Sequence, residues 1–195
     1  MQSVRDSWLL LAGCCGVLAL FLSFRVWVAS QIDFGAFQTF LAVGMPKFVE
    51  KLLPVPVDVL GTPEGRVAYG FEEFPVIVLS GLWAIARGSE CLSGRLSAGT
   101  MEMLLAQPIR RFTLFATHTL VTLAGAALVG FASWLGTGLG VAWSSFAEPP
   151  ELRVFTPAAV NLVGLCVFFA GFTTLLSAVT RTRSQTVALA IGFYV

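Results

Sequence analysis

The chain has 195 residues and a formal net charge of +1, with 56% hydrophobic and only 12% charged residues. A soluble domain usually carries about twice this charged fraction, and the small net charge gives no indication of a nucleic-acid partner. The composition therefore excludes an ordinary soluble domain. Apolar runs of roughly 20 residues are instead what a bilayer requires of a crossing helix. We predict an all-α fold, in the form of a polytopic transmembrane helix bundle within the lipid bilayer.

Apolar segments follow one another along the chain, separated by polar connections. We expect one transmembrane domain over residues 1–195, with spans at about residues 8–29, 74–92, 112–140 and 155–179, and a truncated span that begins at 186. Arg5 precedes the first apolar segment, but no small-residue cleavage site follows it, so we interpret this segment as a retained span. Since the last segment stops before it could cross a membrane, we expect the sequence to be a fragment of a longer protein.

Some features of these segments lead to further expectations. Arg25, near the far end of the first span, should snorkel to the membrane interface. Residues 34–53 hold aromatic and aliphatic side chains three or four apart, which favours an amphipathic helix on the membrane surface. The apolar run of residues 112–143 is too long for one upright helix. It should therefore tilt, or break near the glycines Gly136, Gly138 and Gly140.

The distribution of arginine among the connections predicts the orientation. If the N-terminus lies inside, the inner segments hold Arg5, Arg87, Arg95, Arg110, Arg111, Arg181 and Arg183. The outer loops then hold most of the acidic residues. Basic residues favour the cytoplasmic side of a membrane protein. We therefore expect a cytoplasmic N-terminus, with residues 87–111 and 181–184 on the same side.

The connection between the second and third spans, residues 87–111, has the pattern of a short helix. Gly99 and Thr100 can open this helix, with Ser97 or Thr100 as its N-cap. Glu102 falls in the first turn, where a negative charge is favourable. The apolar face consists of Met101, Leu104 and Leu105. The result is a short cytoplasmic amphipathic helix that needs a partner: lipid headgroups, the protein's own helix ends or another protein.

The same residues resemble a known family. The pattern Gly99, Thr100, Met101, Glu102, followed by Leu104, Leu105, Pro108 and Arg111, resembles the E-x-GT-x-E-x-LL-x-x-P-x-x-R segment of ABC transporter permeases of the type-two exporter class. The upstream glutamate differs, since Arg95 and Leu96 occupy its stretch and Glu90 is the nearest upstream acid. In the family this segment is a coupling helix that docks on an ATPase. Glu90 and the residues of the pattern are therefore the candidate contacts with that partner.

The resemblance also implies the rest of the assembly. It implies about six spans, of which this chain would cover four and part of a fifth. It implies a separate ABC ATPase subunit as partner, a homodimer or heterodimer of permeases, and a place in the bacterial inner membrane. Hydrolysis in the ATPase would move the coupling helix and tilt the spans, which would drive export.

Motifs for catalysis or for cofactors are absent from the sequence. No GxxxxGK[ST] occurs, so another chain must bind ATP and we predict no enzyme activity in this one. His118 is the sole histidine, and we interpret it as an interfacial or helix-packing residue. The cysteines form no CxxC pair and are interpreted as small buried hydrophobes. We expect neither a metal nor a cofactor.

We therefore predict the permease subunit of an ATP-driven exporter, with its cargo unspecified. The polar and glycine residues of the fourth span are interpreted as helix-packing features: Asn161, Thr173, Thr174, Ser177, Gly164 and Gly171. The alternative is a non-transport membrane scaffold or assembly component without an ATPase partner, which would share every hydropathy feature. A membrane-embedded enzyme is disfavoured because catalytic motifs are missing.

Overall fold

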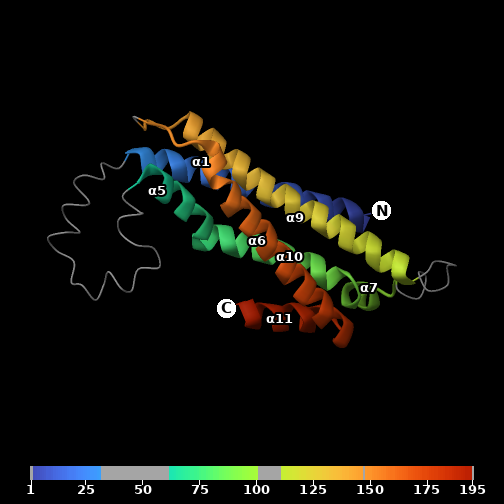
Figure 1. Cartoon of the computed structure of the whole chain (residues 1–195). Coiled ribbons are helices and arrows are strands. Elements are labelled where there is room, and N and C mark those ends of the chain that lie inside the picture. Colours follow the sequence, from blue (N-terminus) through green and yellow to red (C-terminus); the bar gives the residue numbers. More distant parts are fainter. Residues whose placement is uncertain (1, 32–61, 101–110, 147, 195) are drawn as a thin grey trace, which may run out of the picture.

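The computed structural model of the chain describes residues 2–31, 62–100, 111–146 and 148–194, and within them every regular element is a helix (Figure 1). In chain order these elements are α1 (Gln2–Gln31), α5 (Pro63–Tyr69), η1 (Gly70–Glu72), α6 (Phe74–Glu90), α7 (Ser93–Ser97), α9 (Arg111–Ala142), η2 (Leu152–Phe155), α10 (Thr156–Val179) and α11 (Arg183–Tyr194), where η denotes a 3-10 helix. The amphipathic helix predicted for residues 34–53 lies outside the described residues.

Long apolar helices form the body of the molecule. Within the described part of the chain, four segments are long and apolar enough to cross a bilayer: Trp8–Gln31, Pro63–Glu90, Phe112–Ala142 and Leu152–Val179. They run alternately in opposite directions, and α1 packs along α9 while α6 packs along α10 (Figure 1). The N-terminus, α7 and the turn between α10 and α11 share one end of the bundle, termed the α7 end. The opposite end, with α5 and η2, is termed the α5 end. The predicted polytopic α-helical bundle is confirmed.

The second span begins earlier than its apolar run. Thr62 caps α5, because its Oγ1 accepts a hydrogen bond from the backbone N–H of Gly65 at 3.0 Å, and Pro63 follows at the first helical position. α5 and η1 then lead into α6, and they lengthen the span by residues that we predicted as part of a polar loop. Where α6 begins, Glu73 forms an ion pair with Arg25 of α1. The charge of Arg25 is thus balanced by a neighbouring span and does not depend on snorkelling alone.

The third span is one unbroken helix, and its glycines allow close packing. α9 continues without interruption through Gly136, Gly138 and Gly140, so of the two alternatives that we considered, a tilt or a break, the break does not occur. A Cβ atom at Gly136 would lie 2.5 Å from both the Cα and the carbonyl oxygen of Ala19 in α1. A side chain at this position would force the two helices apart. Close backbone approach at small residues is the usual way in which transmembrane helices associate.

A buried serine strengthens the contact between α1 and α9. The Ser23 hydroxyl lies 2.7 Å from the carbonyl oxygen of Gly136 across the interface, and 2.7 Å from that of Ala19 in its own helix. A Cβ atom at Gly140 would lie 2.8 Å from the Ser23 carbonyl oxygen, so the backbones stay close for a further turn. The hydrogen bond depends on this proximity, because wider helix separation would move the hydroxyl out of reach of the Gly136 carbonyl.

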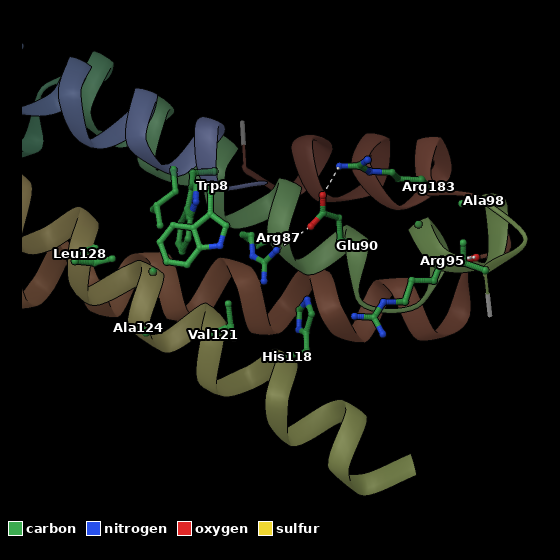
Figure 2. A pocket seen from close by; sticks show the side chains of 15 residues that line it. Trp8, Arg87, Glu90, Arg95, Ala98, His118, Val121, Ala124, Leu128 and Arg183 are labelled. Atoms are coloured by element: carbon green, nitrogen blue, oxygen red, sulfur yellow. Dashed lines mark hydrogen bonds and ion pairs between the residues drawn. The ribbon is translucent and has the colours of Figure 1, made fainter. Parts of the chain in front are cut away.

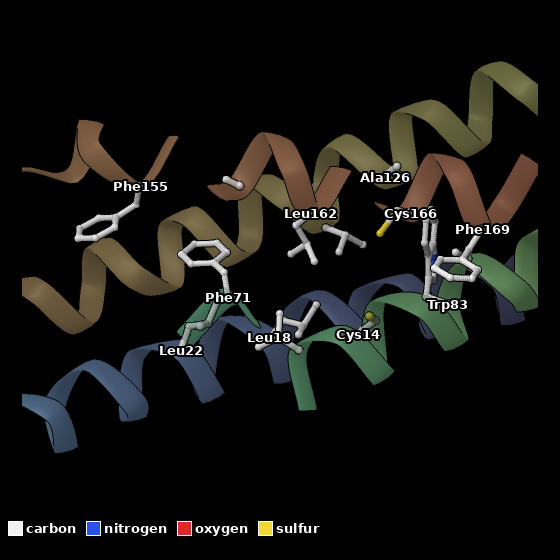
Figure 3. Packing of buried hydrophobic residues seen from close by; sticks show 14 of the residues in the cluster. Cys14, Leu18, Leu22, Phe71, Trp83, Ala126, Phe155, Leu162, Cys166 and Phe169 are labelled. Atoms are coloured by element: carbon white, nitrogen blue, oxygen red, sulfur yellow. The ribbon is translucent and has the colours of Figure 1, made fainter. Parts of the chain in front are cut away.

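Apolar side chains fill the space between the spans and also cover the outside of the bundle. Figure 3 shows part of the buried cluster, with Leu22 of α1 near Phe71 and, further along the bundle, Trp83 of α6 near Cys166 of α10. Leu20, on the opposite face of α1, is 72% exposed. Since lipid tails are as apolar as leucine, burial of apolar surface does not distinguish the inside of the bundle from its outside. Shape and polar contacts must select the arrangement.

The glycines of α10 differ from those of α9. Among the described residues, nothing lies within 4 Å of a Cβ atom placed at Gly164 or Gly171. The interpretation of these two glycines as helix-packing positions is therefore wrong for contacts within the described chain. The Thr174 hydroxyl also stays within α10, where it donates to the Ala170 carbonyl at 2.7 Å. Ser177, by contrast, connects separate elements.

The two kinds of glycine predict different results for the same substitution. Gly136→Ala should destabilise the bundle by about 1–3 kcal/mol, because the new methyl group collides with backbone atoms of α1. Gly164→Ala should leave stability unchanged or raise it by up to about 1 kcal/mol, since alanine favours a helix and displaces nothing nearby. Thermal unfolding of both variants in detergent measures the difference. Equal losses of stability would contradict the close approach of α1 and α9.

Candidate functional site

The α7 end of the bundle contains the start of the segment singled out in the sequence. Within the first residues of this segment, the last turn of α6 crosses α10 at close range. A Cβ atom at Gly88 would lie 2.6 Å from the carbonyl oxygen of Ala170 and 2.6 Å from the Cβ of Thr173. α6 then ends at Glu90. The segment therefore leaves the bundle from a point at which the second and fourth spans are in direct contact.

A short helix that was not predicted from the sequence, α7, opens the segment. Its N-cap residue, Leu92, makes no side-chain capping hydrogen bond. The Ser177 hydroxyl of α10 takes this role, since it accepts hydrogen bonds from the backbone N–H groups of Leu92 at 3.1 Å and Ser93 at 2.8 Å. A cap usually comes from the residue that precedes the helix. Here it comes from another span, and it fixes the start of α7 to α10.

Buried hydroxyl groups extend this connection to α11. Ser93 Oγ donates to the Ser89 carbonyl at 3.0 Å and accepts from Ser177 Oγ at 3.1 Å. Thr186 Oγ1 of α11 donates to the same Ser93 oxygen at 2.7 Å. These four residues are completely buried. We term them the hydroxyl cluster. Because polar groups away from water interact strongly only when they are paired, this cluster holds α6, α7, α10 and α11 in one arrangement.

Glu90 lies beside the hydroxyl cluster and joins α6 to α11 by charge (Figure 2). Its carboxylate forms ion pairs with Arg87 at 2.9 Å and with Arg183 of α11 at 3.7 Å. Arg183 Nε also donates to Ser89 Oγ at 3.3 Å. The three charged side chains are partly exposed, so each pair adds little stability. Their effect is to orient the end of α6 against the start of α11.

Gly99 ends α7. It has a φ of 65°, a left-handed conformation that favours glycine, and its N–H bonds to the Leu96 carbonyl at 3.1 Å. Ser97, considered as an N-cap for the following helix, lies instead in the last turn of α7, where its hydroxyl donates to the Gly94 carbonyl at 3.1 Å. Thr100 follows and donates from Oγ1 to the Arg95 carbonyl at 3.2 Å.

The structure places only part of the predicted coupling site. Glu90 and Thr100 line one cavity at the α7 end, on either side of α7. Gly99 separates α7 from Thr100. The remaining candidates that fall outside the described residues are Met101, Glu102, Leu104, Leu105 and Pro108. Arg111 begins α9, but its side chain is not among those described.

The described residues at this end form no metal or nucleophilic site. His118 of α9 is buried, in line with its interpretation as a helix-packing residue, and it lines the same cavity as Glu90. Among the described residues, no three His, Cys, Asp or Glu side chains are grouped as metal ligands would be. Burial raises the pKa of the Cys91 thiol, and the nearby Arg95 and Arg87 offset only part of this effect. A thiol of this kind is a poor nucleophile at neutral pH.

Comparison with known proteins identifies the family. The profile described as ABC-2 family transporter protein matches residues 2–195. The chain belongs to the ABC-2 transporter family. No curated protein and no solved structure matches it. As a member of this family with membrane-spanning helices, the chain is an integral membrane protein of the ABC transporter permease type.

Some features of the site could be recognised from the sequence, and others only from the structure. The motif from Gly99 to Arg111 indicated the family from the sequence alone, whereas no sequence pattern indicated the hydroxyl cluster. Gly99 was a local signal for the end of α7, since glycine commonly follows the last helical residue. Ser177 gave no comparable signal, because the backbone groups that it caps lie 84 and 85 residues away in sequence.

Removal of the Ser177 hydroxyl should loosen α7. In Ser177→Ala, the part-buried N–H of Leu92 and the buried N–H of Ser93 lose their acceptor, which should cost about 1–3 kcal/mol of local stability. Hydrogen exchange measured by mass spectrometry should therefore become faster over residues 92–97. Ser133→Ala is a matched control, because Ser133 is equally buried and its hydroxyl bonds only to the Val129 carbonyl of its own helix. Similar exchange of α7 in both variants would contradict capping from α10.

Proposed function

We propose that this ABC-2 permease is the membrane-spanning subunit of an ATP-driven exporter. A separate ATPase subunit would bind at the α7 end and hydrolyse ATP. The coupling helix that follows Thr100 would receive the movement and pass it to the spans. The family match and the motif from Gly99 to Arg111 support this reading.

The observation that carries the proposal is the attachment of α7 to several spans at once. A segment that transmits force must be connected to the parts that it moves. α7 continues from α6, is capped by Ser177 of α10, and contacts Thr186 of α11 through Ser93. Displacement of α7 would therefore act on three helices together. Buried, fully paired hydroxyl groups suit this role because they resist sliding.

Within this proposal the candidate residues have four roles. Glu90 is engaged by Arg87 and Arg183, so we assign it to positioning the end of α6. Gly99 would supply the sharp turn between α7 and the coupling helix. The contact with the ATPase would come from Thr100, Met101, Glu102, Leu104 and Leu105, with Pro108 and Arg111 closing the segment.

We further propose that the α7 end is cytoplasmic. The start of α1 and the described residues of both connections predicted to be cytoplasmic lie at this one end (Figure 1). The described residues there include Arg87, Arg95, Arg181 and Arg183, whereas the α5 end holds several glutamates. Basic residues favour the cytoplasmic side. The bacterial inner membrane and a dimer of permeases around the transport path follow from the family resemblance and complete the proposal.

The ATPase contact can be tested by co-purification from detergent. The double variant Glu102→Arg, Leu105→Asp should lose the ATPase subunit that the unaltered protein retains, because it reverses a charge and places a carboxylate on the apolar face. A matched control is Glu151→Arg, Val154→Asp, which makes the same changes on exposed residues of the α5 end. The control should retain the ATPase at equal membrane abundance.

The possible results separate the two functional hypotheses. Selective loss in the coupling variant supports the permease of an exporter. If no nucleotide-binding protein accompanies even the unaltered chain, the exporter proposal fails and the scaffold or assembly component is favoured. Equal loss in both double variants would contradict the α7 end as the docking site.

A further inference from the structure

A cavity of about 540 Å³ opens at the α7 end, between α1, α6, α7 and α9 (Figure 2). The residues that line it form two chemically different parts. Side chains near α7 are basic or polar, whereas those deeper along α1 and α9 are apolar. A cavity with these two parts fits an amphiphile, because one part can bind a charged group and the other an apolar chain.

The polar part holds donors that lack a partner. His118 is not one of them, because its ring hydrogen-bonds to the Arg87 backbone and its buried Nε2 is then the acceptor of a neutral imidazole. Arg95 is half-buried, and no described residue pairs with its guanidinium. Figure 2 shows Arg95, Arg87 and His118 converging from α7, α6 and α9. Arg87 bonds to Glu90 through Nη1 alone, and a guanidinium has further donors. The guanidinium groups of Arg87 and Arg95 can bind an anion together.

The local charge also favours an anion. Arg87, Arg95 and Arg183 line the cavity against one carboxylate, that of Glu90. A smaller cavity of about 280 Å³ shares Arg87, Arg95 and His118. The three residues therefore face open space on two sides. Oxygen atoms of a phosphate group match the forked N–H donors of the two guanidinium groups of Arg87 and Arg95.

The apolar part continues onto the lipid-facing surface. Trp8 of α1 and Val121 and Leu128 of α9 line the cavity, and they are 59%, 48% and 44% exposed. Trp83 forms the inner wall, and its buried Nε1 has no partner among the described residues. A tryptophan near the headgroup region is typical of a membrane interface. The cavity is therefore open toward the bilayer and not only toward water.

We propose that this cavity binds an anionic phospholipid of the surrounding bilayer. The phosphate lies between Arg87 and Arg95, and one acyl chain follows the groove along Val121 and Leu128. A soluble phosphate would satisfy the basic residues but would leave the apolar part in contact with water. A neutral zwitterionic lipid would bring an ammonium group beside the arginines. An anionic lipid satisfies both parts of the cavity. Binding requires neither the ATPase partner nor transport, so it extends beyond the proposed function.

Native mass spectrometry of the full chain in mild detergent tests this inference. Phosphatidylglycerol should bind about tenfold more tightly than phosphatidylcholine, the discrimination expected for one charge-assisted hydrogen bond. Arg95→Gln should weaken phosphatidylglycerol binding about tenfold and leave phosphatidylcholine binding unchanged, whereas Arg95→Lys should restore part of the preference. Since no described residue pairs with Arg95, the substitution should not unfold the bundle. Arg153→Gln, on the exposed surface of the α5 end, is the control and should change neither affinity.

The remaining results would overturn the inference. Equal binding of the two lipids would show that the cavity has no preference for an anion. Equal weakening by Arg95→Gln and Arg153→Gln would show attraction to surface charge in general. Displacement of phosphatidylglycerol by inorganic phosphate at the same concentration would show an anion site that does not use the apolar groove. None of these results bears on the ATPase proposal, because that proposal is tested separately by co-purification.

Discussion

Close approach of helix backbones is the constraint on which the rest of this bundle depends. In a bilayer an apolar side chain gains little by leaving lipid for another helix, so packing and polar contacts must hold the spans together. At Gly136 the backbones of α1 and α9 come so near that a Cβ atom would collide with Ala19. Gly88 has the same effect between α6 and α10. Each contact brings hydroxyl groups within reach of partners on a neighbouring helix.

The hydroxyl cluster at the α7 end follows from the second of these contacts. With α6 pressed against α10, Ser177 can reach the backbone N–H groups that begin α7. Ser93 can then reach Thr186 of α11. Water would compete with these bonds at an exposed surface, but the cluster is fully buried. The same end thus combines a rigid link between helices with the start of the segment that carries the family motif.

Charges at the α7 end have two different environments. Glu90 engages Arg87 and Arg183, which orients α6 and α11. Arg95 and His118 instead face a cavity that opens toward lipid. A bound anionic lipid would sit against α7 and α9, beside Thr100, from which the segment of the family motif continues. The composition of the inner leaflet would then bear directly on the part of the permease that we propose receives the movement of the ATPase.

The sequence by itself determined the helical class, the existence of the spans and the family. Hydropathy suffices for the spans, because a bilayer demands long apolar helices wherever the chain crosses. The motif from Gly99 to Arg111 suffices for the family, because its residues are adjacent in sequence.

Tertiary structure alone decided which small and polar residues form contacts. Gly136 and Gly164 look alike in sequence, yet one meets a neighbouring backbone and the other faces outward. Ser177 caps α7, which is distant from it in sequence. Arg25 of the first span forms an ion pair with Glu73 of the second span. Such partners depend on the rotation and spacing of helices, which the apolar pattern leaves undetermined because lipid and protein are equally apolar surroundings.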